Sequence, residues 1–292
     1  MANSVNICCP ICESSDRKAV WDQGAYCMSR CRGCGLYYQS VRLSEAELQV
    51  RYQKEHKEKV AASRRSERGR KDRHQTAFME PRGGDHADCL EALAKIERFK
   101  KKGELLEVGF GSGLLLVLAR EKGWNVRGLD VSEYGVARAR ERHSLDVWCG
   151  KLEDSSFAER SFDAVILRQV LEHVYDLDPF LKKVRGILKN DGLLFVEVPN
   201  IAGLDYRAKS LLAAFHLRSP VWKSMYIPEH LYYFSPATLS RLMEKHGFAV
   251  LAWETYSHFR RRGRLGYRLA SLRHVLRVGN KMRFFMTKRT PS

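Results

Sequence analysis

From residue 104 to residue 200, short apolar runs alternate with amphipathic segments. The runs are rich in Val, Leu and Phe, as is typical of buried strands, whereas the segments between them repeat apolar positions at helical spacing. Such alternation predicts an α/β fold in which crossover helices join the strands of a parallel sheet. We expect strands at residues 104–109, 125–130, 146–150, 162–170 and 192–199, and helices at 114–123, 132–142 and 178–190.

The pattern loosens on either side of this region. Beyond residue 200 we expect an insert at about 201–235, a helix at 237–247, a strand at 248–258 and a short last strand at about 282–288. Residues near the N-terminus are rich in Cys and Gly, and the following segment is charged and helical in pattern. We therefore expect three parts: a zinc-ribbon-like module at 1–40, a helical basic linker or lid at 41–100 and the main domain at 101–292.

The composition suits this organisation. A chain of 292 residues that is 44% hydrophobic can form one main domain with a small accessory module. Its start has no basic end followed by an apolar run, and no stretch approaches the roughly 18 consecutive apolar residues that a membrane helix needs. We expect a soluble, cytoplasmic protein.

The net charge of +17 comes from two segments. Residues 51–73 contain ten Lys and Arg against four acidic residues, and residues 255–292 contain eleven against none. This balance favours an anionic partner, which could be a negatively charged small molecule, nucleic acid or an anionic membrane surface. A solvated surface is the alternative. The most crowded basic positions are Arg64, Arg65, Arg68, Arg70, Lys71 and Arg73, and Arg260, Arg261, Arg262, Arg264 and Arg268.

A membrane-facing role would also need an apolar strip. The predicted insert contains apolar residues that could supply one. They are Leu211, Leu212, Phe215, Leu217, Val221 and Trp222.

Two CxxC pairs lie in the N-terminal module, separated by 18 residues. They consist of Cys9, Cys12, Cys31 and Cys34. Four thiolates at this spacing are typical of a ribbon in which one structural Zn²⁺ is held tetrahedrally, and metal ligation is favoured over disulfides because six of the eight cysteines crowd into the first 34 residues. Cys8 and Cys27 are alternative ligands, and we expect Cys89 and Cys149 to be ordinary buried residues.

A glycine-rich loop follows the first predicted strand of the main domain. Residues 107–113 read Glu-Val-Gly-Phe-Gly-Ser-Gly, and glycines there allow a tight turn and leave room for a ligand against the main chain. A dinucleotide-binding loop has a third glycine where this chain has Leu114. Glu107 would repel a diphosphate but could hold the positively charged amino end of a methionine moiety.

Asp130 ends the second predicted strand, 17 residues after Gly113. A carboxylate at this position can accept two hydrogen bonds from ribose hydroxyls. Alternatively, Asp130 caps the helix that begins near Ser132, although Ser132 can do that itself. Together the loop and Asp130 describe an adenosine ligand without a diphosphate.

Four segments resemble, in order and spacing, the motifs of class I S-adenosylmethionine-dependent methyltransferases. They are ELLEVGFGSG, GLDVS, SFDAVILRQVLEHV and LKNDGLLFVEVPN. The resemblance covers about residues 100–255. It implies a Rossmann-like, seven-stranded, mostly parallel sheet with helices on both faces and an antiparallel last strand. S-adenosylmethionine would lie over the carboxyl ends of the first two strands.

The resemblance also implies which residues contact the cofactor. The methionine portion would lie against Gly109, Gly111 and Gly113, the ribose against Asp130 and Val131, the adenine edge against Leu152 and Glu153, and the methionine and sulfonium beside Arg168 and Gln169. Many members of the family have an acidic residue, contacting the adenine amino group, where this chain has Lys151. That contact therefore differs here.

The N-terminal layout resembles bacterial methyltransferases of natural-product, nucleotide-sugar and surface-polysaccharide pathways. In both cases a CxxC pair, a CxxCG pair and a helical segment precede the core. In those relatives the ribbon and helices form part of the substrate lid. The resemblance implies a small, anionic or glycosylated metabolite as the methyl acceptor.

Two histidines are candidates for the proton acceptor that a hydroxyl, amine or carbon-acid nucleophile would need. His173 follows the fourth strand, and His230 lies beyond the fifth, within residues 228–235. Alternatively, His173 caps or packs a loop, and His230 anchors the insert while the aromatic residues 232–234 are buried against the sheet.

Two other functions compete with small-molecule methylation. The zinc ribbon and the charge suit an RNA methyltransferase, but the Asn/Asp-Pro-Pro-aromatic signature of many amino-directed nucleic-acid methyltransferases is absent, and LEHV follows the fourth strand instead. The other alternative is a non-catalytic binding protein that retains the cofactor fold. The intact glycine loop and Asp130 argue against it.

Overall fold

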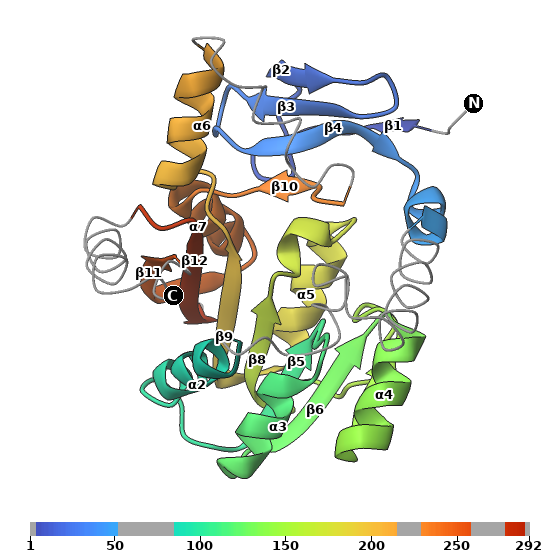
Figure 1. Ribbon diagram of the computed structural model, residues 1–292, viewed down its shortest axis with the longest axis vertical. Coiled ribbons are helices and arrows are strands. Elements are labelled where there is room, and N and C mark those ends of the chain that lie inside the picture. Colours follow the sequence, from blue (N-terminus) through green and yellow to red (C-terminus); the bar gives the residue numbers. More distant parts are fainter. Residues whose placement is uncertain (1–3, 52–84, 215–228, 258–277, 290–292) are drawn as a thin grey trace, which may run out of the picture. The chain divides into compact units, whose positions relative to one another are not determined.

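The computed structural model describes residues 4–51, 85–214, 229–257 and 278–289. Seven strands form the larger of two sheets, in the order β11-β12-β9-β8-β5-β6-β7 (Figure 1). The strands are β5 (Glu104–Val108), β6 (Asn125–Asp130), β7 (Val147–Cys149), β8 (Phe162–Arg168), β9 (Leu188–Pro199), β11 (Phe248–Tyr256) and β12 (Lys281–Lys288). β5 runs parallel to β6 and β8, and β6 parallel to β7, whereas β11 and β12 are antiparallel. The predicted seven-stranded, mostly parallel sheet is confirmed.

The chain divides into two compact units. One contains Glu45–Arg168 and Lys182–Leu194. The other contains Met1–Ser44, Gln169–Leu181 and Phe195–Ser292.

Helices cover the strands of the unit that contains β5 to β8. They include α2 (Asp85–Ile96), α3 (Leu114–Glu121) and α4 (Glu133–His143). α3 packs against β6 and α2, and α4 packs against β6 and β7. Gly128 of β6 makes close packing feasible, because a Cβ there would lie 2.7 Å from the Leu116 side chain of α3 and 2.8 Å from that of Val147. The local sequence therefore fits the crossover geometry that the hydrophobic pattern predicts.

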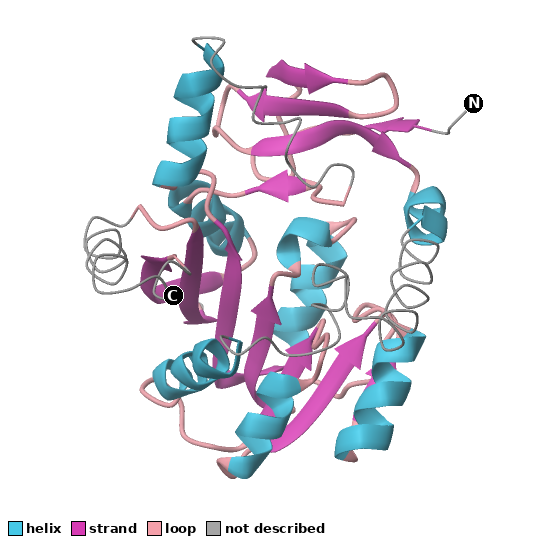
Figure 2. Cartoon of the chain, viewed as in Figure 1, coloured by secondary structure: helices cyan, strands magenta, loops and turns pink. Residues whose placement is uncertain are grey.

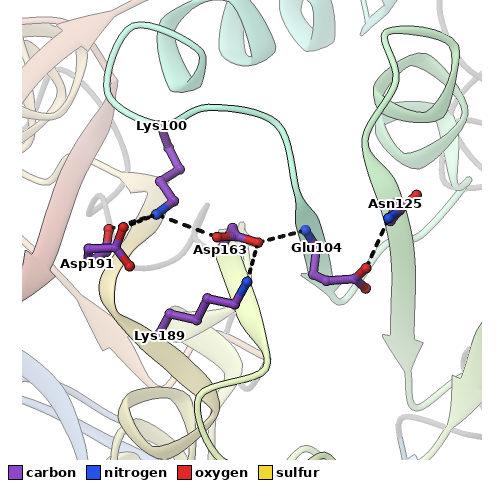
Figure 3. Close-up of polar contacts among 6 residues, drawn as sticks. All are labelled: Lys100, Glu104, Asn125, Asp163, Lys189 and Asp191. Atoms are coloured by element: carbon purple, nitrogen blue, oxygen red, sulfur yellow. Dashed lines mark hydrogen bonds and ion pairs between the residues drawn. The ribbon is translucent and has the colours of Figure 1, made fainter.

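A charged network joins the starts of three strands in this same unit (Figure 3). Asp163 at the start of β8 accepts hydrogen bonds from Lys189 Nζ at 2.7 Å and from the backbone N–H of Glu104 at 2.9 Å. Lys100 Nζ lies 3.5 Å from Asp163 and 2.6 Å from Asp191. Burial alone would raise the pKa of Asp163, but the bond from Lys189 and the other donors hold it below its ordinary value. The network therefore holds together the amino-terminal ends of β5, β8 and β9, whereas the glycine loop follows the carboxyl end of β5.

The smaller sheet belongs to the other unit and is antiparallel (Figure 2). Its order is β1-β4-β3-β2, with β10 paired to β4. The strands are β1 (Ser4–Asn6), β2 (Arg17–Asp22), β3 (Cys27–Cys31), β4 (Tyr37–Leu43) and β10 (Tyr232–Tyr233). β10 comes from the segment that we expect to be an insert of the main domain, and Tyr232 lies opposite Tyr38. Tyr232 and Tyr233 therefore pair with the N-terminal sheet, and all three aromatic residues at 232–234 are buried.

Four further helices complete the secondary structure of the described residues outside 45–51. They are η2 (Leu171–His173), α5 (Leu177–Ile187), α6 (Leu204–Ala214) and α7 (Pro236–Lys245). α7 begins at a capping box, in which the Ser235 side chain accepts the N–H of Thr238 and the Thr238 hydroxyl accepts the N–H of Ser235.

Several predicted boundaries differ from the structure, among them those at the end of the fourth strand and before the fifth. The strand predicted at 162–170 ends at Arg168, because Gln169 has a φ of 55°, a left-handed conformation that ends the extended run. The helix predicted at 178–190 ends at Ile187, and β9 starts at Leu188 instead of Gly192. Leu188 is fully buried, and a buried leucine fits both the helical and the strand periodicity. The hydrophobic pattern therefore does not show where α5 ends and β9 begins.

Some predictions fall outside the described residues. These include most of the basic cluster at 51–73, the arginines at 260–268, and the apolar residues Phe215, Leu217, Val221 and Trp222. Leu211 and Leu212 are described, and both are exposed. None of the helices in the described part of the chain is long and apolar enough to span a membrane.

Candidate functional site

The glycine loop connects β5 to α3. Its three glycines, Gly109, Gly111 and Gly113, have φ values of 69°, 55° and 75°, all left-handed. The N–H of Gly109 donates to the carbonyl of Leu129 at 2.7 Å, which ties the loop to β6. Glycine adopts this conformation without the strain that a side chain would cause, so the sequence sets the path of the loop. A Cβ at Gly111 would meet no atom within 4 Å, so this part of the loop borders open space.

Asp130 is tied to the middle of this loop. One carboxylate oxygen accepts the N–H of Gly111 at 3.0 Å, and the other accepts the N–H of Ser132 at 2.9 Å. The Ser132 hydroxyl accepts the N–H of Gly135 at 3.0 Å, so Ser132 is the N-cap of α4. A carboxylate has about four lone-pair positions, so Asp130 can still accept hydroxyl hydrogens from a ligand.

The other cofactor residues expected near β5, β6 and β7 differ in exposure. Glu107 is buried in β5, and Val131 is 51% exposed directly after Asp130. Leu152 is buried, while burial raises the pKa of the half-buried Glu153. Lys151, which the resemblance sets apart from the rest of the expected adenine contacts, pairs with Glu45 at 2.6 Å.

Arg168 and Gln169 end the fourth strand. Arg168 Nη1 donates to Cys89 Sγ at 3.1 Å, which links the strand to α2. The Gln169 N–H donates to the Glu197 carbonyl at 2.7 Å. The backbone N–H of Gln169 therefore keeps a hydrogen-bond partner where the turn ends β8.

Four cysteines gather in the small sheet. Cys9 Sγ lies 3.4 Å from Cys34 Sγ, and Cys12 Sγ lies 3.4 Å from Cys31 Sγ. All four sulfur atoms lie within 4.8 Å of one another. Thiolates around a tetrahedral zinc ion, each about 2.3 Å from the metal, have sulfur–sulfur separations of this order. The donor set and its geometry fit structural zinc.

The remaining cysteines are separate from this group. Cys8 is exposed, and the Cys27 thiol lies 3.6 Å from the Ser29 hydroxyl. Cys89 is buried as expected. The expectation for Cys149 is wrong, because this residue ends the short edge strand β7 and is exposed.

The structure brings the two candidate histidines together. Their ring centroids are 4.6 Å apart, with the rings nearly perpendicular. His173 Nδ1 lies 2.9 Å from the Glu229 carbonyl oxygen. Since a carbonyl oxygen only accepts, this nitrogen is the donor and carries the proton. The Nε2 atom of neutral His173 then holds the lone pair.

Glu172 completes a cluster with the two histidines that the sequence did not predict. Its carboxylate and the two imidazoles have potential ligand atoms within 4.8 Å of one another. Glu172 is buried, and neither carboxylate oxygen has a hydrogen-bond partner in the described residues. Burial raises the pKa of Glu172 to about 8, and burial together with the charge of His173 lowers the pKa of His230 to about 3. The acidic residue inside the apolar run LEHV was the available signal.

The seven-stranded sheet, with a glycine loop at the end of its first parallel strand, defines the class I S-adenosylmethionine-dependent methyltransferase fold. Two solved structures share this fold. A SAM-dependent methyltransferase from Archaeoglobus fulgidus has a TM-score of 0.51 and 18% identity, covering 69% of this chain and 93% of that one. The PH0226 protein from Pyrococcus horikoshii has a TM-score of 0.52 and 19% identity, covering 74% and 96%.

Sequence comparison gives the family. A family model described as "Methyltransferase domain" matches residues 80–252, more than half of the chain, and the chain belongs to this family. The human mitochondrial ubiquinone biosynthesis O-methyltransferase is 31% identical over 156 residues, covering 50% of this chain and 42% of the relative. The enzyme of that name from Bradyrhizobium diazoefficiens is 31% identical over 141 residues, covering 44% and 54%. The chain spans about half the length of these relatives.

Proposed function

We propose that this chain binds S-adenosylmethionine at residues 107–113 and transfers its methyl group to a hydroxyl of a small metabolite. The observation that carries the proposal is the bond between Asp130 and Gly111. It places a carboxylate, suited to ribose hydroxyls, beside a loop position where a Cβ would meet no neighbour. Glu107, buried in the preceding strand, supplies a negative charge for the methionine amino group.

The remaining cofactor contacts follow from the same assignment. Val131 would flank the ribose, Leu152 and Glu153 the adenine, and Arg168 and Gln169 the methionine end. Because Lys151 is paired with Glu45, we assign the adenine edge to Leu152 and Glu153 instead of to the lysine.

The acceptor is proposed to be an oxygen nucleophile on an anionic or glycosylated metabolite. Two relatives whose alignments cover about half of this chain are named O-methyltransferases, which favours a hydroxyl acceptor. The net charge of +17 favours an acceptor that carries negative charge.

His173 is proposed to accept the hydroxyl proton. When bound, S-adenosylmethionine supplies an electrophilic methyl group, and the protein has to orient the acceptor and take up its proton. His173 is exposed, and Nε2 is the ring nitrogen without a proton because Nδ1 donates to Glu229. His230 is a much weaker base, since its pKa is lowered to about 3. We assign it the role of orienting His173 and the acceptor.

The four clustered cysteines are proposed to bind one structural Zn²⁺. Their closed set of thiolates leaves no open coordination position for a substrate, as is typical of structural zinc. The metal would hold the loops that precede β2 and β4 in the small sheet.

Methyl transfer can be tested without knowing the acceptor. The full chain is incubated with methyl-tritiated S-adenosylmethionine and either a metabolite extract or an RNA fraction. We expect label in anionic small molecules, resistant to nuclease. Label confined to nuclease-sensitive RNA would support an RNA methyltransferase instead, and cofactor binding without transfer in either arm would favour a non-catalytic binding protein.

A further inference from the structure

Gln39, in the middle of β4, is bonded twice to the segment that contains His230. Its backbone N–H donates to the Leu231 carbonyl at 2.9 Å, and its side-chain Nε2 donates to the His230 carbonyl at 2.9 Å. Gln39 is fully buried. A buried amide that reaches a backbone carbonyl about 190 positions away fixes that backbone in place, because losing the donor would leave the carbonyl unsatisfied.

These bonds belong to a continuous set. The Glu229 carbonyl accepts from His173 Nδ1, so three successive carbonyls, at residues 229–231, have donors. The Leu231 N–H donates in turn to the Glu172 carbonyl at 2.7 Å. The segment at 229–231 is therefore held by β4 on one side and by η2 on the other, and both belong to the same compact unit.

β4 is also connected to the cysteine cluster. Gln39 lies opposite Met28 in β3, the strand that ends at Cys31. The Cys31 N–H donates to the Leu36 carbonyl just before β4. The β3–β4 hairpin therefore connects the cysteine knuckle to the strand that contains Gln39.

We propose that Gln39 is a positioning residue for the proton acceptor. By holding the His230 and Leu231 carbonyls, it places the Glu229 carbonyl where it accepts from His173 Nδ1. This contact keeps neutral His173 in the tautomer whose Nε2 carries no proton, because the partner of one ring nitrogen determines which nitrogen carries the proton. The catalytic part of this inference rests on the proposed function, whereas the tautomer does not.

The tautomer can be measured directly in the full zinc-loaded chain. Nitrogen-15-labelled histidines are observed by multiple-bond NMR correlation at alkaline pH, and His173 is assigned by its disappearance in His173→Gln. We expect the Nδ1–H tautomer in the unmodified protein and a shift to Nε2–H in Gln39→Met, which keeps the side-chain length but removes the donor. Where methyl transfer is measured, kcat of Gln39→Met should fall about 10- to 100-fold with KM for S-adenosylmethionine unchanged.

Ser40→Ala is the matched control. Ser40 is fully buried beside Gln39, and its hydroxyl bonds to the Ser29 hydroxyl at 2.8 Å, so the variant also removes a buried hydrogen bond from β4. It should keep the Nδ1–H tautomer. The proposal is overturned if Gln39→Met keeps this tautomer, or if Ser40→Ala loses it equally.

A second variant covers poor folding of Gln39→Met. Gln39→Leu replaces the amide by an apolar side chain that has no donor and buries no charge, and it must also lose the Nδ1–H tautomer. The tautomer measurement needs neither cofactor nor acceptor. Failure of methyl transfer in the unmodified protein would therefore refute the proposed function. The tautomer of His173 in the Gln39 variants would still test the role of Gln39 independently.

Discussion

The Asp130 carboxylate accepts the backbone N–H of Gly111 at 3.0 Å. The end of β6 thereby fixes the loop that follows β5, and the N–H of Gly109 strengthens this tie by donating to Leu129. A loop held in this way needs little ordering when a ligand binds, which favours affinity. The same carboxylate that would recognise the ribose therefore also builds the loop beside it.

Gly103→Ala tests the charged network at the strand starts. A Cβ at residue 103 would lie 2.2 Å from Asp163 Oδ2, so alanine has to displace the carboxylate that Lys189 and the Glu104 N–H bind. We expect the free energy of unfolding to fall by about 1–3 kcal/mol in denaturant titrations. Gly186→Ala, at a helical position with no atom within 4 Å, is the control and should not destabilise the protein. Equal stability of both variants would contradict the packing described.

Glu172→Gln tests the buried carboxyl. The pKa of Glu172 is raised to about 8 in the folded protein, against 4.5 for an ordinary glutamate. Between these values the unfolded chain loses the proton while the folded chain keeps it, so the wild-type protein loses stability as pH rises through this window. Glutamine cannot ionise. The stability of the variant relative to wild type should therefore increase between about pH 5 and pH 8.

The matching control is Glu141→Gln, at an exposed position. Its relative stability should change much less over the same range in urea titrations. A constant difference between Glu172→Gln and wild type would show that Glu172 does not stay protonated in the folded state.

His173→Gln and His230→Gln separate the two histidines. Loss of the proton acceptor should lower kcat of His173→Gln by about 10²- to 10⁴-fold without changing cofactor affinity. His230→Gln should be less affected in kcat, because a group with a pKa of about 3 is a poor base at neutral pH. His246→Gln, which removes a bond to Asp178 at 2.8 Å, controls for general damage. Unchanged turnover in His173→Gln, with cofactor bound, would remove His173 from the mechanism.

Cys12→Ser tests the metal site. We expect the purified chain to contain one zinc, measured by elemental analysis, and Cys12→Ser to lose it together with thermal stability. Cys8→Ser changes another exposed cysteine of the same loop, and it should retain zinc. Loss of zinc from both variants, or from neither, would refute the assigned ligands.

The sequence predicts helices and strands well where the hydrophobic positions follow a single periodicity. β6 matches its prediction at 125–130, and β5 differs from 104–109 by one residue, because each strand is a short apolar run between clear turns. The left-handed turn at Gln169 could not be predicted, since no glycine marks it.

The roles of Gln39 and Glu172 were not predicted, because they depend on pairing between segments far apart in the chain. Glu172 is an acidic residue between apolar positions, which is visible in the sequence, but nothing local marks Gln39, and the pairing of β10 with β4 joins segments about 190 residues apart. Only the folded chain shows that Gln39 reaches His230 and that Glu172 is buried beside both histidines. The CxxC spacing, by contrast, predicted the four-sulfur cluster, with Cys8 and Cys27 as alternative ligands that the structure places outside it.

Calorimetric titration with S-adenosylmethionine tests whether the glycine loop binds this cofactor. The wild-type chain should bind it, and Gly111→Ala should bind at least about tenfold more weakly, because the added methyl group occupies the open side of the loop and strains a φ of 55°. Gly24→Ala places alanine at a φ of 71° with no atom within 4 Å, and it should bind like wild type. No binding by the folded wild-type chain, or equal affinity of Gly111→Ala, would refute cofactor binding at this loop.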